Sequence, residues 1–165
     1  MTYTVSQSFN VSSLTQAAVP KAIAAFQRLT TDDKLGLLWA LYQNMGGAIT
    51  PAAPGAARLQ FAEGLLQRVK AMSPEAQLQF MRDLVQQKNT SETRSYGVLT
   101  NNTKLAFWYQ LAVLMDEGEV IPVPGYYKLS TAATAVYAEI AQLEFGQQLS
   151  VMRQAVVAMG FDPLA

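Results

Sequence analysis

The sequence contains neither cysteine nor histidine among its 165 residues. Disulfides, thiolate nucleophiles and Cys- or His-ligated metal sites are therefore excluded, and the commonest general base of enzymes is missing. The chain also lacks a Gly-rich phosphate loop, a nucleophile elbow and an HExxH motif. Its few carboxylates gather at expected helix ends, where solvation and the helix dipole place structural acids. These absences argue against an enzyme and against a metal centre.

Charge is scarce as well. Charged residues make up 15% of the chain, and twelve basic residues balance twelve acidic ones. No net field favours nucleic acid or an anionic membrane. No apolar run reaches the ~18 residues that a membrane span needs. The first twenty residues contain no Lys or Arg and no clean apolar core, so a secretory signal is not expected. We expect a cytoplasmic, monomeric protein that does not span a membrane.

Half of the residues are apolar, and their spacing predicts an all-α domain. Residues 1–18 are rich in Ser, Thr and Gln and predict an arm, followed by a helical domain over 19–165. Start signals are clearest at Pro20, at 30–33, at Ser73-Pro74 and at Ser130. Helices are expected over these ranges: 20–29, 34–45, 56–72, 75–88, 101–115, 131–143 and 147–160. The polar stretch 89–101 predicts a loop between two helical halves, and 120–127 predicts an extended segment because of its prolines.

Residues 101–115 (NNTKLAFWYQLAVLM) carry apolar side chains all the way round the expected helix, with Asn101 and Asn102 as caps. A helix of this kind is buried on every side, or it lines an apolar site. Trp108 is then either a core residue or a platform for a flat ligand. Trp39 and Tyr42 share a face one helical turn apart, and six methionines add adaptable apolar surface. Spacing alone does not separate a filled core from a tunnel for an elongated apolar ligand.

Arg153 is unusual because the helical wheel places it within an apolar arc, between Leu149 and Val156. A guanidinium cannot shed its charge, so it needs a polar partner or a route to solvent. It either reaches the rim of the domain or faces a partner beside an apolar surface.

Several segments together resemble the N-terminal domain of the orange carotenoid protein family. The resemblance runs in register over nearly the whole chain and rests on 39–42 (WALY), 52–57 (AAPGAA), 60–63 (QFAE), 104–109 (KLAFWY), 127–130 (YKLS), 146–148 (GQQ), Arg153 and 160–162 (GFD). Because the chain stops where that family's interdomain linker would begin, it is similar to the stand-alone helical carotenoid proteins. The resemblance implies two interleaved four-helix bundles around a tunnel that holds a keto-carotenoid, such as canthaxanthin or echinenone.

The resemblance also implies site residues. Tyr42 and Trp108 match the pair that clamps a carotenoid end ring, and Arg153 matches an arginine used toward a C-terminal domain or a phycobilisome. Lys104 is expected beside Arg153 as a partner-binding residue. The remaining tunnel residues are expected to be Leu35, Leu38, Trp39, Ile49, Pro54, Gly55, Leu105, Tyr109, Met115, Val123, Tyr127, Leu149, Val156 and Met159.

Three departures from the family pattern stand out. Pro51 replaces an aliphatic residue, Arg82 replaces a small thiol, and 123–126 (VPGY) replaces an acidic turn. Without a C-terminal domain, the resemblance implies a permanently active-like state. The expected function is quenching of singlet oxygen by the bound pigment. The alternatives are quenching of phycobilisome excitation at the thylakoid surface, and exchange of pigment with a stand-alone homologue of the C-terminal domain.

Overall fold

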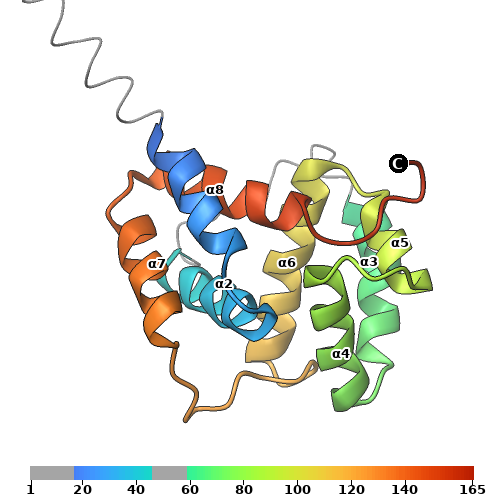
Figure 1. The fold of residues 1–165 in the computed structure, drawn as a ribbon. Helices are drawn as coiled ribbons and strands as arrows, with labels where there is room; N and C mark the ends of the chain where they lie inside the picture. Colours follow the sequence, from blue (N-terminus) through green and yellow to red (C-terminus); the bar gives the residue numbers. More distant parts are fainter. Residues whose placement is uncertain (1–16, 46–58) are drawn as a thin grey trace, which may run out of the picture.

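The computed structural model describes residues 17–45 and 59–165. Within these ranges every regular element is a helix, as the apolar spacing predicted, and Figure 1 shows their arrangement. A helix over residues 17–27 comes first. It is followed by α2 (Thr31–Met45), α3 (Leu59–Lys70), α4 (Pro74–Val85), α5 (Ser91–Gly97), α6 (Asn101–Asp116), α7 (Thr131–Ala141) and α8 (Phe145–Val157).

Helix α6 runs through the middle of the domain and contacts α3, α8 and α2 (Figure 1). Helices α3, α4 and α5 lie on one side of it, while α2 and α7 pack together on the other. Helix α2 also contacts α4, which links the two sides. This arrangement confirms the all-α class and the central place of α6. The more detailed prediction of two interleaved four-helix bundles stays a prediction.

Two helix starts follow the local sequence signals closely. The Ser73 hydroxyl accepts a hydrogen bond from the Ala76 N–H, with Pro74 at the first helical position. The Ser130 hydroxyl likewise accepts from the Ala133 N–H at the start of α7. Caps of this kind stabilise a helix by about 1 kcal/mol each, and they depend only on neighbouring residues. That dependence is why the sequence located them correctly.

Other boundaries differ from the predicted ones. The cap of α6 is Thr100, which accepts from the Thr103 N–H, rather than the two asparagines that follow. Pro20 is not the first residue of its helix, because residues 17–19 are already helical. Helix α8 begins one residue before Gly146, with Glu144 as its cap, and ends at Val157.

The polar stretch 89–101 is not simply a loop, because α5 forms inside it. Thr90 and Thr93 make a reciprocal capping box, and Thr93 is fully buried. Helix α5 packs against α3 and α4. Five of the seven residues of α5 are polar, so no apolar stripe forms and hydrophobic periodicity did not predict this helix. The Thr-x-x-Thr spacing was the one local signal of a helix start.

The segment between α6 and α7 is extended, as predicted from its prolines. The buried Gln77 side chain fixes its beginning, because Gln77 Oε1 accepts from the Ile121 N–H at 2.8 Å and Gln77 Nε2 donates to the Val69 carbonyl at 3.0 Å. Helix α4 thereby holds the extended segment against the end of α3. None of the described helices has the length and apolar character to cross a membrane.

Candidate functional site

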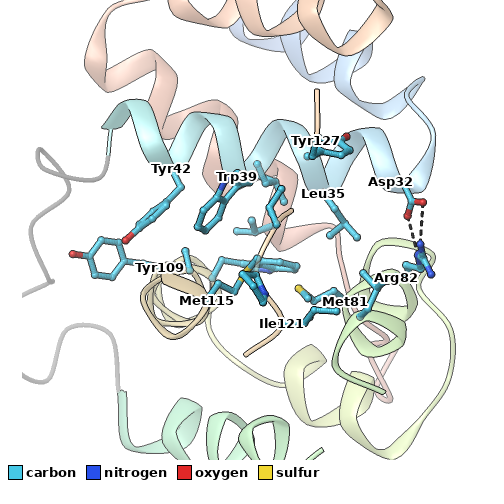
Figure 2. Close-up of a pocket in the computed structure, with 18 of the residues that line it drawn as sticks. Asp32, Leu35, Trp39, Tyr42, Met81, Arg82, Tyr109, Met115, Ile121 and Tyr127 are labelled. Atoms are coloured by element: carbon cyan, nitrogen blue, oxygen red, sulfur yellow. Dashed lines mark hydrogen bonds and ion pairs between the residues drawn. The ribbon is translucent and has the colours of Figure 1, made fainter. Parts of the chain in front are cut away.

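An elongated apolar pocket lies between α2 and α6 and is closed by α4, α8 and the extended segment (Figure 2). Its volume is about 330 Å³, at the lower end of the range typical of small-molecule sites. The lining residues are Asp32, Leu35, Gly36, Leu38, Trp39 and Tyr42 from α2; Leu78, Met81 and Arg82 from α4; Leu105, Trp108, Tyr109, Ala112 and Met115 from α6; Ile121, Pro122, Val123, Pro124 and Tyr127; and Met152 and Val156 from α8.

Aromatic rings from two helices gather at one end of this pocket. Trp39 and Tyr42 lie on the same face of α2 because three residues make about one helical turn. Their ring centroids are 5.7 Å apart, and Tyr42 meets Tyr109 of α6 edge-on at the same distance. Figure 2 shows the three rings side by side. Flat, partly exposed rings of this kind suit the faces of a flat apolar ligand.

Trp108, on the pocket side of α6, is held in place by a buried tyrosine. Its indole Nε1–H donates to the Tyr96 hydroxyl at 3.0 Å, and that hydroxyl donates to the Val156 carbonyl. Tyr96 is fully buried, and burial raises the pKa of its hydroxyl far above the usual range. It sits against Gly160, where a Cβ would lie 2.5 Å from its Cδ1 atom. The chain Trp108–Tyr96–Val156 thus fixes two pocket walls relative to each other.

Tyr127 closes the pocket from the extended segment. Its ring rests on Gly36 of α2, where a side chain would collide with it. The start of α7 is tied to the same end of α2, since the Ser130 hydroxyl donates to Asp33 Oδ2 at 2.8 Å. Burial, and then the carboxylates of Asp33 and Asp32, raise the pKa of Tyr127. The hydroxyl therefore stays neutral at physiological pH.

The end of the pocket away from Tyr42 is charged. Arg82 Nε donates to Asp32 Oδ1 at 2.9 Å and Arg82 Nη2 to Asp32 Oδ2 at 3.1 Å, a bidentate ion pair that Figure 2 marks with dashed lines. Among the described residues, Asp32 and Arg82 are the only charged ones in the pocket lining. Every other lining side chain is aliphatic, aromatic or a thioether, apart from the tyrosine hydroxyls and the indole nitrogens.

The titratable groups at the aromatic end give no sign of acid–base chemistry. Burial, followed by the nearby Asp116 carboxylate, raises the pKa of Tyr42, so its hydroxyl remains protonated. No cluster of acidic side chains suited to a metal ion occurs in residues 17–45 and 59–165. The arrangement is that of a binding site for an elongated, largely apolar molecule.

Most of the expected site residues come together in this pocket: Leu35, Leu38, Trp39, Tyr42, Leu105, Trp108, Tyr109, Met115, Val123, Tyr127 and Val156. Ile49, Pro54, Gly55 and the departure at Pro51 lie outside the described residues. Leu149 and Met159 do not line the pocket; Met159 is buried in the core, and Leu149 packs against the core from its edge. The assignment of ligand contacts stays a prediction for all of them.

Arg153 is exposed, which agrees with the expectation that it reaches the rim of the domain, and it does not line the pocket. The buried arc of α8 runs through Val151, Met152, Ala155 and Val156, so Arg153 lies beside this arc, exposed, and not within it. It makes no ion pair or hydrogen bond with the described residues. Lys104 is only 7% exposed and donates from Nζ to the Val157 carbonyl at 3.3 Å. The role of Lys104 toward a partner stays a prediction.

Sequence reasoning missed ten of the lining residues. Ala112 lies one turn from Trp108, and Met152 one turn from Val156, so helical spacing could have found both. The α4 residues could not be found in that way, because their place depends on which face α4 turns toward α2. The others missed were Asp32, Gly36, Leu78, Met81, Arg82, Ile121, Pro122 and Pro124.

The sequence and the fold have relatives among known proteins. Residues 12–162 match the family model described as "Orange carotenoid protein, N-terminal". An orange carotenoid-binding domain-containing protein of Nostoc sp. is 54% identical over 160 residues, which cover 97% of this chain and 92% of that protein. The chain therefore belongs to the family of orange carotenoid protein N-terminal domains.

Solved structures agree with this assignment. The Orange Carotenoid Protein of Anabaena (Nostoc) sp., solved binding canthaxanthin, superposes with a TM-score of 0.82 at 45% identity. The match covers 88% of this chain but 47% of that protein, so this chain spans about half of its length. The Red Carotenoid Protein of the same organism, also solved binding canthaxanthin, has a TM-score of 0.77 at 36% identity, with 87% and 99% coverage.

Proposed function

We propose that this chain binds a keto-carotenoid in the pocket between α2 and α6 and uses it in photoprotection. The observation that carries the proposal is the row of rings from Trp39, Tyr42 and Tyr109 at one end of an apolar pocket, with Trp108 farther along it. A carotenoid has this shape, with cyclic end groups on a long polyene. The two Anabaena proteins bind canthaxanthin in the same fold.

Photoprotection by such a complex needs no catalytic residue. A polyene accepts excitation energy physically and returns it as heat, so the protein has only to hold the pigment, keep it dispersed and exclude competing contacts. The pocket lining suits this role because almost all of it is apolar, and because the hydroxyls of Tyr42 and Tyr127 stay neutral. Singlet oxygen is a small molecule that diffuses to the pigment, so quenching it requires no docking surface on the protein.

The test is to produce the chain in a canthaxanthin-producing host and to quantify extracted pigment against protein. We expect one keto-carotenoid per chain and a coloured, folded product. The holoprotein should then shorten the lifetime of singlet oxygen in solution, and the apoprotein should do so far less. A folded but colourless protein would contradict the proposal.

A second function, quenching of phycobilisome excitation, is favoured by one specific observation. Arg153 is exposed on α8, without an ion pair to the described residues, and the guanidinium is suited to bidentate contacts with carboxylates of a partner. The same arginine is also suited to bind a stand-alone homologue of the C-terminal domain during pigment exchange. Fluorescence of isolated phycobilisomes mixed with the holoprotein tests antenna quenching: a decrease supports it, and an unchanged signal leaves singlet-oxygen quenching and pigment exchange as the remaining functions.

A further inference from the structure

The position of the Arg82–Asp32 ion pair is not explained by stability. Both side chains are partly exposed, 37% for Arg82 and 61% for Asp32, and ion pairs so exposed contribute little to folding. Yet the pair lies in the lining of a pocket that is otherwise almost free of charge. A charged group beside apolar surface that a ligand would cover must either remain hydrated or find a polar atom on that ligand.

Asp32 fixes the orientation of the guanidinium and leaves part of it available. The two hydrogen bonds use Arg82 Nε and one Nη2 hydrogen. A guanidinium carries five N–H donors, so three remain, two of them on Nη1. Within residues 17–45 and 59–165, Nη1 has no hydrogen-bond partner. The Asp32 carboxylate therefore fixes the Arg82 guanidinium at the pocket wall and leaves three of its N–H donors unused by the described residues.

The two ends of the pocket are chemically different. The end formed by Trp39, Tyr42 and Tyr109 offers ring faces, and the end formed by Arg82 offers hydrogen-bond donors (Figure 2). Asp32 is already occupied as an acceptor for Arg82, so donors dominate at this end. The matching ligand atom is an acceptor such as a carbonyl oxygen.

We infer that Arg82, held by Asp32, is a subsite for the carbonyl oxygen of a ketolated end ring. This rests on the proposed function and names its ligand more closely: a carotenoid with a carbonyl on the ring at the Arg82 end, oriented with its other ring among the aromatic side chains. A hydrocarbon carotenoid would cover the guanidinium without giving it an acceptor. The subsite therefore selects ketolated over unoxygenated carotenoids and sets the direction in which the pigment lies.

The test is competition between β-carotene and canthaxanthin, which differ only in the ring carbonyls. Apoprotein is mixed with equal amounts of the two pigments in detergent and purified, and the bound ratio is measured after extraction. We expect the wild type to favour canthaxanthin and Arg82→Met to lower that preference about fivefold, as for one charge-assisted hydrogen bond weakened by solvent. Total bound pigment should be unchanged. Arg82→Lys keeps the charge but loses the planar set of N–H donors, so its preference for canthaxanthin should lie between those of the wild type and Arg82→Met.

Arg94→Met is the matched control, because Arg94 lies on α5, outside the pocket lining, and its side chain donates to Asn89 Oδ1. A direct readout comes from echinenone, which has a single carbonyl: its stretching band should lie lower in the wild type than in Arg82→Met. The subsite is overturned if the wild type and Arg82→Met show the same preference for canthaxanthin, or if the wild type binds β-carotene and canthaxanthin equally well. Either result leaves the proposed function standing. A folded wild type that takes up neither pigment overturns both.

Discussion

Tyr127 can rest on α2 only because residue 36 is glycine. A Cβ at Gly36 would lie 2.2 Å from the Tyr127 hydroxyl oxygen and 2.7 Å from two ring carbons. No rotation of the methyl group relieves such a contact, so either the ring or the helix has to move. The glycine therefore positions the extended segment, and with it one wall of the pocket.

Gly36→Ala should accordingly displace Tyr127 and weaken pigment retention. Alanine favours a helix over glycine by about 1 kcal/mol, so the loss should appear in binding more than in helix content. Gly64→Ala is the matched control, since Gly64 lies within α3 with no atom within 4 Å of its added Cβ. That variant should gain thermal stability and bind pigment normally. Equal pigment retention in the two variants would mean that the Tyr127 contact is unimportant.

Tyr96→Phe should loosen Trp108 without changing the shape of the core. The change removes one hydroxyl and leaves the Trp108 N–H and the Val156 carbonyl without that partner. A loss of about 1–3 kcal/mol in the free energy of unfolding is typical of such a change. The indole N–H resonance of Trp108 should shift as well. Tyr137→Phe, on the half-buried side of α7, is the control and should change neither the stability nor that resonance.

Truncation of the two expected clamp residues should affect pigment more than folding. Trp108→Ala and Tyr42→Ala each remove ring area from the pocket, whereas Phe80→Ala removes a ring buried in the core beside Phe107. Loss of an aromatic core residue typically costs ~3–5 kcal/mol. Denaturation with and without carotenoid separates the two roles. If Trp108→Ala and Tyr42→Ala lose the same stability in both states, as expected of Phe80→Ala, the rings belong to the core.

Arg153→Leu should leave folding and carotenoid content nearly unchanged, because the side chain is exposed and makes no ion pair with the described residues. It should weaken association with a phycobilisome core or with a C-terminal-domain homologue. A desolvated charge pair lost at an interface costs ~2–5 kcal/mol, and a solvated one much less. Titration of each partner against wild type and variant measures the difference. A variant that bleaches or misfolds would make Arg153 a structural residue instead.

Lys104 should make stability depend on alkaline pH. Burial lowers the pKa of its ammonium below 10.5, and the Asp162 carboxylate offsets this only in part. Between the lowered value and 10.5, the unfolded chain binds more protons than the folded one, so the contribution of Lys104 to stability rises with pH. The free energy of unfolding of the wild type should therefore rise relative to Lys104→Met as the pH increases through this window. A constant difference between the two proteins would contradict the assignment.

The sequence correctly predicted the features that depend on residues close together in the chain. Ser73 and Ser130 cap helices through bonds that span three residues, and the spacing of Trp39 and Tyr42 places both rings on one face of α2. Helix α5 was missed because a buried threonine and tertiary contacts stabilise it, not an apolar stripe. Arg153 was placed in an apolar arc because the wheel does not tell which side of α8 meets α6.

The site residues show the same difference between positions set by local sequence and positions set by packing between helices. Most of the α2 and α6 lining residues were expected from the resemblance, whereas Met81, Arg82 and Leu78 enter the pocket only because α4 packs against α2. Their contribution depends on contacts between residues far apart in the chain, such as the Arg82–Asp32 pair, whose members are 50 residues apart. No periodicity within one helix contains that information.

The hydrogen bond between Gln77 and the extended segment has a consequence for the rate of pigment exchange. This wall of the pocket is attached by the Gln77–Ile121 hydrogen bond at its start and by Tyr127 on Gly36 near its end, while Pro122 and Pro124 have no N–H to add further bonds. Apolar packing holds the wall as well, since Val120 is buried and Ile121 and Val123 pack against the core, so opening has to break this packing together with the hydrogen bond. Exchange of pigment can then run on the timescale of a local opening, so a stable protein need not hold its cargo irreversibly. We expect Gln77 thereby to influence how long the pigment stays.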